Sequence, residues 1–224
     1  MKYSNIFDRH SNLWGEEKMN KVRNASLFIA GIGGLGTTLS QILVRSGIGK
    51  LYIMDNGIID EPDLNRQSLY SILDIGKKKV EVAKKKLKKF NDSQTEIISY
   101  NNIIDENLNL PDDILGVVDC LDNYKSRFYL ENALSDGKFY IHGGIMMDFG
   151  QVISLIKGKS KSLKDIFANY SESTNTIEVS PDIVFSISSI MVRETLNHIW
   201  KEPKLLNTFL IVEFSDFKIS RIKI

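Results

Sequence analysis

Short apolar runs that are rich in β-branched and aromatic residues recur along the chain, and each predicts a strand. Stretches between the early runs carry apolar residues at every third or fourth position, which is the spacing of one face of a helix. Residues 77–90 are one such stretch, because Val80, Ala83, Leu87 and Phe90 share a face. The runs that predict strands are 26–30, 50–55, 96–100, 116–122, 138–144, 151–157, 208–214 and 218–224.

The order of these elements predicts the fold class. Strands alternate with helices as far as about residue 145, which predicts a parallel sheet with right-handed crossovers. Residues 141–157 then follow a pattern of strand, turn and strand, and a helix over 184–200 precedes a final pair of strands. We therefore predict an α/β fold: a Rossmann-like, mostly parallel sheet with helices on both faces, extended by C-terminal antiparallel strands.

Composition limits the classes of function. The 224 residues suit one domain, and a formal net charge of +1 gives no electrostatic case for nucleic acid or an anionic membrane. No apolar run is long enough to span a bilayer and the first ten residues have no signal-peptide core, so we expect a cytoplasmic protein. The single cysteine, Cys120, excludes an intrachain disulfide and any metal site built from several thiolates.

A glycine-rich loop follows the first predicted strand. Gly31, Gly33 and Gly36 have GxGxxG spacing, which allows a tight turn, close approach to a phosphate and close packing of the next helix. Asp55 lies 19 residues after Gly36 at the end of the next strand, where a carboxylate can accept hydrogen bonds from a ribose. The loop indicates a nucleotide, and it leaves open both a hydride-transferring dehydrogenase and glycines that serve packing alone.

Polar residues after Asp55 favour a triphosphate over hydride transfer. Asn65, Arg66 and Gln67 form a polar cluster, and Lys79 opens the next predicted helix. Asp122 follows an apolar strand at the edge of the sheet where ligands of α/β proteins bind. Arginine and lysine neutralise phosphate oxygens, and an aspartate can hold Mg²⁺.

These stretches together resemble the ThiF/MoeB/HesA family, the bacterial and archaeal relatives of ubiquitin-activating enzymes. The resemblance covers nearly the whole chain, through "FDRH", "GIGGLG", "LYIMD", "DLNRQ", "GKKKVEVA", "DCLDN" and "HGGIMMDFGQV". It implies a single adenylation domain over 1–224 that adenylates a carboxylate with Mg·ATP and releases pyrophosphate. Its implied parts are an N-terminal helical arm over 1–25, an ATP-binding part over 26–145, and a substrate-groove and dimer part over 146–224.

The resemblance also implies roles for single residues. Asp55 would hold the ribose, Asp122 would bind Mg²⁺, and Arg9 would enter the ATP site of a partner subunit, which makes the enzyme a homodimer. A catalytically silent regulatory subunit is the alternative, and the presence of every phosphate ligand argues against it. The catalytic residues would be Arg9, Arg66, Lys79 and Asp122. The nucleotide would be bound, together with Asp55 and Asp122, by Gly31, Gly33, Gly34, Gly36, Asn65, Arg66, Gln67 and Lys79.

Two departures from the family bear on the substrate. The chain lacks the CxxC pairs that bind zinc in many members, and the crossover segment 171–184 has no cysteine to form a thioester. We expect Cys120 to be a packing residue, the reaction to stop at the acyl-adenylate, and a separate enzyme to accept the acyl group. These losses favour a small-molecule carboxylate such as the pyridinol precursor of the guanylylpyridinol cofactor.

The alternative substrate is the C-terminal glycine of a ubiquitin-like sulfur-carrier protein. Either carboxylate would lie in a groove along residues 142–150 and under residues 171–182. His142 would then either contact substrate or be a hydrogen-bonded histidine of the core.

Overall fold

The computed structural model describes residues 3–91, 94–168 and 178–224, so the first half of the crossover segment, residues 171–177, lies outside the described residues. One eight-stranded sheet has the order β3-β2-β1-β4-β5-β6-β7-β8. The strands from β3 to β5 are parallel and those from β5 to β8 are antiparallel, which confirms the predicted fold class. The strands are β1 (Ser26–Ala30), β2 (Lys50–Met54), β3 (Glu96–Tyr100), β4 (Gly116–Asp119), β5 (Phe139–Met146), β6 (Phe149–Ile156), β7 (Thr208–Glu213) and β8 (Lys218–Lys223).

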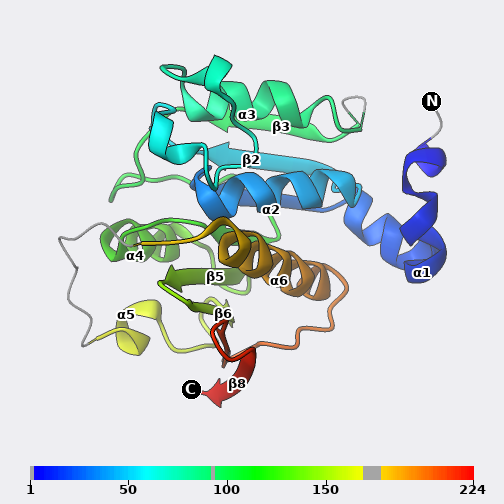
Figure 1. Cartoon of the computed structure of the whole chain (residues 1–224). Coiled ribbons are helices and arrows are strands. Elements are labelled where there is room, and N and C mark those ends of the chain that lie inside the picture. The colour runs from blue at the N-terminus through cyan, green and yellow to red at the C-terminus, as the bar shows by residue number, and fades with distance from the viewer. Residues whose placement is uncertain (1–2, 92–93, 169–177) are drawn as a thin grey trace.

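Helices cover both faces of this sheet. Helices α2 and α6 pack against each other on one face, which Figure 1 shows toward the viewer. Helices α4 and α5 pack on the other face over a second apolar cluster. The helices are α1 (Tyr3–Arg23), α2 (Gly34–Arg45), α3 (Lys79–Leu87), α4 (Tyr124–Ala133), α5 (Leu163–Ile166) and α6 (Pro181–Ile199), with short 3₁₀ turns η1 (Glu61–Asp63) and η2 (Ile72–Asp74).

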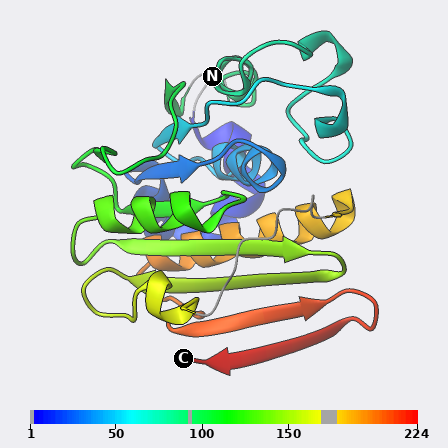
Figure 2. The same cartoon turned by 90° about the vertical axis from the view of Figure 1, so that its left-hand side faces the viewer.

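The central strands are mostly apolar because helices bury both of their faces. All five residues of β1 are buried, with Leu27 and Ile29 in the cluster under α2 and α6 and Phe28 in the cluster on the opposite face. The antiparallel end is less covered, and Figure 2 shows β8 as the free edge of the sheet. In the part of the chain that the structure describes, no helix is long and apolar enough to cross a membrane.

Helix α1 lies away from the loops that follow the parallel strands. It bends at Gly15, whose φ is 79°, and Trp14 packs edge-on against Trp200 with ring centroids 5.1 Å apart. Figure 1 places α1 beyond the C-terminal end of α2, on the opposite side of the molecule from residues 56–78. The arm is therefore attached at the end of the sheet that is remote from the glycine loop.

Several predicted bounds differ from the structure by one to three residues, and one of them lies at the candidate site. The fourth strand ends at Asp119 and not at residue 122, because the Asp119 carboxylate accepts a hydrogen bond from the backbone N–H of Leu121 at 3.0 Å and turns the chain out of the sheet. Residues 120–122 therefore form a loop at the sheet edge. This loop carries the candidate metal ligand Asp122.

A buried carboxylate joins α6 to the segment before β7. Glu194 is 2% exposed and accepts hydrogen bonds from the backbone N–H groups of Lys204 and Leu205. It also accepts hydrogen bonds from Ser154 Oγ at 2.9 Å and Asn197 Nδ2 at 3.0 Å. Since these donors come from β6, α6 and the loop between α6 and β7, Glu194 fixes the position of the antiparallel extension.

We expect Glu194→Ala to lower the free energy of unfolding by about 2–4 kcal/mol, because it leaves several buried donors without an acceptor. The measurement is urea unfolding at pH 7. Glu202→Ala is the matched control: its carboxylate is half exposed and pairs with Lys18 at 3.1 Å, so its loss should cost less than about 1 kcal/mol. Equal losses for the two variants would contradict the role of Glu194.

Candidate functional site

The predicted site residues follow neighbouring strands at one edge of the sheet. Strands β2, β1, β4 and β5 are adjacent in that order and parallel, so their carboxyl ends lie in a row. Asp55 follows β2, the glycine loop follows β1, and Asp122 follows β4. Ligands of α/β sheets bind at this edge.

The glycine loop combines a packing constraint with an open surface. Gly31 has a φ of +88°, and a Cβ there would lie 2.7 Å from the carbonyl oxygen of Cys120. A Cβ on Gly36 would overlap the carbonyl of Gly31, so these two glycines are required by packing. Gly33 and Gly34 have more room, and α2 begins there without a side-chain cap. The backbone N–H groups of this helix end are therefore available to an anion.

The carboxylate of Asp55 is held in one orientation by the backbone. Its Oδ2 accepts the N–H of Ile32 at 2.7 Å, and its Oδ1 accepts the N–H of Gly57 at 2.7 Å. A carboxylate oxygen has a second lone pair, so Asp55 can still accept hydrogen bonds from a ribose. The strand position predicted from the sequence thus gives a fixed acceptor beside the glycine loop.

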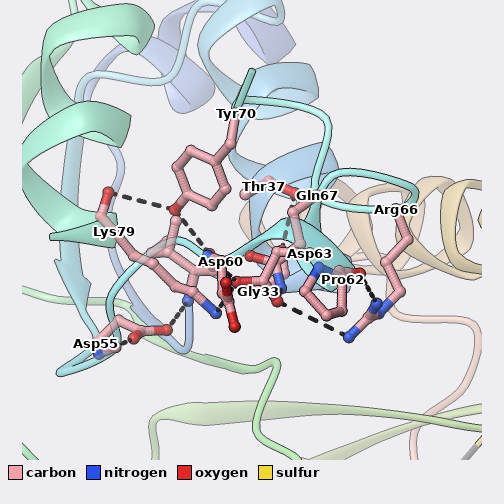
Figure 3. Close-up of polar contacts among 12 residues, drawn as sticks. Gly33, Thr37, Asp55, Asp60, Pro62, Asp63, Arg66, Gln67, Tyr70 and Lys79 are labelled. Carbon is pink, nitrogen blue, oxygen red and sulfur yellow. Dashed lines mark hydrogen bonds and ion pairs between the residues drawn. The ribbon is translucent and has the colours of Figure 1, made fainter. Parts of the chain in front are cut away.

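Two cations lie next to the glycine loop, on either side of Asp63. Lys79 Nζ is 3.1 Å from Asp63 Oδ2, and Arg66 Nη2 is 3.9 Å from Asp63 Oδ1. Figure 3 shows Lys79 and Arg66 approaching Asp63 from opposite directions. Arg66 Nη1 also donates to the carbonyl of Pro62 at 2.7 Å and to Asn65 Oδ1 at 2.9 Å. Asp63 therefore acts as the counter-ion of both cations in the absence of an anionic ligand.

Gln67 connects this cluster to the glycine loop. Its Nε2 donates to Asp63 Oδ1, and its Oε1 is buried without a hydrogen-bond partner among the described residues. A Cβ on Gly33 would lie 3.8 Å from Gln67 Nε2, so the two residues are close neighbours. Asp63 was missed in the sequence, although an acid three residues before an arginine, with a lysine nearby, is a recognisable ion-pair pattern.

Asp122 lies exposed at the next strand end. Its Oδ1 accepts a hydrogen bond from Asn123 Nδ2 at 3.2 Å, while Asn123 Oδ1 caps α4 through the N–H of Ser126. No three His, Cys, Asp or Glu side chains of the described residues could hold a metal ion together. One exposed carboxylate at this edge of the sheet nevertheless fits Mg²⁺, which proteins often bind through one or two carboxylates and the substrate phosphates.

A buried ion pair supports the loop that carries Asp122. Asp119 is fully buried, and its Oδ2 lies 3.4 Å from Arg127 Nε and 2.8 Å from His142 Nδ1. Burial acts to raise the pKa of the Asp119 carboxyl, but the charge of Arg127 and the hydrogen bonds from His142 and Leu121 hold it below its usual value. Arg127 Nη2 also donates to the carbonyls of Leu121 and Gly143, which joins the β4 loop to β5.

His142 is the hydrogen-bonded core histidine, which was one of its two predicted roles. It is fully buried, and burial together with the charge of Arg127 lowers the pKa of its imidazole. Burial likewise raises the pKa of the Cys120 thiol, which opposes a role as a nucleophile. The absence of a thioester cysteine remains a prediction.

Arg9 is not brought to the other site residues within its own chain. It is exposed on α1, and that helix lies on the opposite side of the molecule from residues 56–78. This placement leaves a partner subunit as the route by which Arg9 could reach a site of this kind.

A cavity of about 620 Å³ adjoins Asp55 and was not predicted from the sequence. Met54 and Asn56, the neighbours of Asp55, line one side of it. Tyr100, the last residue of β3, also lines the cavity, together with Ile103 and Leu108 from the segment after that strand. The cavity continues the row of strand ends beyond the ribose position.

The model of the ThiF family matches residues 7–224 of the chain. A probable molybdopterin-synthase adenylyltransferase of Porphyra purpurea is 34% identical over 166 residues, 71% of this chain and 42% of that protein. The sulfur carrier protein ThiS adenylyltransferase of Bacillus subtilis (strain 168) is 28% identical over 153 residues, 66% of this chain and 46% of that protein. The chain thus spans less than half the length of these two curated relatives.

Solved structures of E. coli MccB have a similar fold. MccB with ATP has a TM-score of 0.81 at 26% identity, covering 98% of this chain and 71% of MccB. MccB with AMPCPP and MccA has a TM-score of 0.82 at 26% identity, covering 99% of this chain and 72% of MccB.

Substitution of Arg127 tests whether its buried ion pair with Asp119 stabilises the fold at the candidate site. Arg127→Met should lower the free energy of unfolding by about 3–5 kcal/mol at pH 7, because Asp119 is left buried without its cation. The lowered pKa of Asp119 stabilises the fold above the unfolded-state value and this contribution is lost as the pH falls. The variant should therefore lose stability at pH 7 and begin acid unfolding at a higher pH than the wild type.

Urea unfolding at pH 7 and acid titration followed by circular dichroism measure both effects. Arg193→Met is the control, since Arg193 is exposed and stacks over Trp200 at 5.6 Å. The control should lose less than about 1 kcal/mol. A loss of that size in Arg127→Met would show that the pair is dispensable.

Proposed function

This chain belongs to the ThiF family, and on that premise we propose that it uses ATP to adenylate a carboxylate, forming an acyl-adenylate and releasing pyrophosphate. The arrangement of Lys79 and Arg66 beside an uncapped glycine loop carries this proposal. Two cations and a helix N-terminus suit a polyphosphate, whereas hydride transfer requires no such pair. The names of the relatives, which are adenylyltransferases, support the same reaction.

Each residue has a defined task in this reaction. Asp55 accepts the ribose hydroxyls, the cavity beside it takes the base, and the N–H groups after Gly33 contact phosphate oxygens. Lys79 and Arg66 exchange Asp63 for the phosphates and neutralise them. This neutralisation matters because an anionic carboxylate must attack an anionic α-phosphate, so catalysis depends on positioning and charge compensation.

Asp122 would bind Mg²⁺, which would supply further charge compensation on the phosphates. Its carboxylate is exposed at the strand end beside the glycine loop, and its single protein hydrogen bond leaves lone pairs for a cation.

For the substrate we choose the C-terminal carboxylate of a peptide or small carrier protein. The Bacillus subtilis relative is named for the sulfur carrier protein ThiS, and the MccB structure was solved with MccA. These names favour the ubiquitin-like carrier over the pyridinol precursor, which finds no support among the relatives described above. Because Cys120 lies under the glycine loop with a raised thiol pKa, a separate acceptor would collect the acyl group.

The first test is ATP–pyrophosphate exchange with a ubiquitin-like protein ending in Gly-Gly. Asp122→Asn preserves the shape of the side chain and removes its charge, so exchange should fall by about 100-fold or more. Asp216→Asn, an exposed acid in the turn between β7 and β8, is the control and should behave as wild type. Full exchange in Asp122→Asn, or tight binding of NAD in place of ATP, would contradict the proposal.

The proposed homodimer is tested by mixing inactive subunits. Arg9→Ala and Asp122→Asn should each be inactive, and a mixed dimer should contain one site with both residues intact if Arg9 acts across the interface. Equal mixing at random should then restore about a quarter of wild-type activity. No recovery, with mixed dimers demonstrated by differently tagged subunits, would show that Arg9 does not act in the partner's site.

A further inference from the structure

Gln151 lies on β6 in the antiparallel extension, and the reaction proposed above gives it no role. We infer that Gln151 is a specificity-determining residue whose side-chain carbonyl accepts a hydrogen bond from the last peptide N–H before the reacting carboxylate. The inference rests on the proposed adenylation and deepens it, since it identifies the substrate as a peptide C-terminus and not a small acid without such a donor.

The order of the strands gives the distance between Gln151 and the strand that precedes Asp122. The nucleotide site runs from Asp55 at β2 across the glycine loop at β1 to Asp122 at β4, and β5 and β6 are the next two strands. Neighbouring strands are about 4.8 Å apart, so Gln151 lies about 10 Å beyond β4. An extended peptide advances by about 3.3–3.6 Å per residue, so a peptide whose carboxylate lies next to Asp122 and whose chain runs toward β6 has its nearest peptide N–H between β4 and β6.

The pairing register shows how far along the strand direction Gln151 lies and which face of the sheet it occupies. Asp119 pairs with His142 and Gly144 pairs with Gln151. Cross-strand partners share a face, as do residues two apart on one strand, so Asp119, His142 and Gln151 lie on the same face. Gln151 therefore lies two residues nearer the carboxyl edge of the sheet than Asp119. This position is level with Leu121, the neighbour of Asp122.

Hydrogen bonding fixes the direction of the Gln151 amide. The ionised Asp119 carboxylate can only accept, so His142 Nδ1 donates to it at 2.8 Å. In the neutral imidazole Nε2 is then an acceptor, and Gln151 Nε2 lies 3.3 Å from it and donates. The carbonyl oxygen Oε1 of Gln151 therefore points away from His142. A flip of the side-chain amide would break this hydrogen bond, so Gln151 presents Oε1 as an acceptor.

The surroundings preserve that orientation. A Cβ on Gly144 would lie 3.1 Å from Gln151 Nε2 and 3.2 Å from its Cγ, so the glycine allows the side chain to lie across β5. The rings of Tyr124 and Phe167 lie 6.4 and 5.3 Å from the His142 ring and flank it. Gln151 itself is half-buried, at the boundary between this cluster and solvent.

The test combines an enzyme variant with a substrate variant in pyrophosphate exchange. The substrates are a ubiquitin-like protein ending in Gly-Gly, the same protein with its last peptide bond replaced by an ester, and a pyridine carboxylic acid. With wild type, the ester should lower kcat/KM about 10-fold, because a carbonyl facing the ester oxygen lacks its donor. In Gln151→Met the ester and the amide should differ less than about 2-fold, with the KM for ATP unchanged in both enzymes.

Two further variants separate recognition from folding. Gly144→Ala, whose Cβ would press on Gln151, should also reduce the discrimination between amide and ester. Ser220→Ala is the control: Ser220 pairs with Ile211 and Ile211 with Gln151, so it occupies the same row two strands away. It should keep wild-type discrimination, and thermal unfolding of all variants should show that each is folded.

The outcomes distinguish the inference from the proposed function. An equal ester penalty in wild type and Gln151→Met would overturn the inference and leave adenylation intact. Wild-type exchange that is as fast with the pyridine carboxylic acid as with the carrier would do the same. Absence of exchange with all three substrates, while ATP still binds, would overturn the proposed function itself.

Discussion

The candidate site depends on one buried ion pair, between Asp119 at the end of β4 and Arg127 on α4. A buried carboxylate is tolerated only when its charge is matched and its lone pairs are bonded. Arg127, His142 and the N–H of Leu121 meet these conditions, and each brings a different segment to the carboxylate. The pair thereby places the loop with Asp122 against β5. Without it, the side chains of this loop would not be held in a fixed position relative to β5.

Two kinds of constraint meet in this row. The close backbone approach between Gly31, Gly36 and Cys120 sets the distance between the loops after β1 and β4. The series of hydrogen bonds from Asp119 through His142 to Gln151 determines how the side-chain amide of Gln151 is oriented on β6. The first constraint is steric and tolerates no side chain, whereas the second is directional and depends on which nitrogen of His142 carries the proton.

The sequence was most informative where a function depends on local spacing. Short-range patterns indicate the glycine loop, Asp55 and the alternation of strands with helices, and the structure confirms the fold class they predict. Gln151 was missed because its importance comes from His142, which lies on the neighbouring strand of the sheet. Asp63 was missed although Arg66 is only three residues away, because its second partner, Lys79, comes close only in the folded chain. The end of β4 was misplaced for a related reason: apolar periodicity cannot show that Asp119 bonds the backbone two residues later.

The counter-ion role of Asp63 has a consequence for the order of events. While Lys79 and Arg66 are paired with Asp63, any anion that enters must compete with a carboxylate that is already in place and costs no binding entropy. A triphosphate carries enough charge to win this competition, but the acyl phosphate of an acyl-adenylate carries a single negative charge. Under the proposed reaction, Asp63 would regain both cations as pyrophosphate departs. By competing with pyrophosphate for Lys79 and Arg66, Asp63 would thus favour release of the leaving group over the reverse reaction.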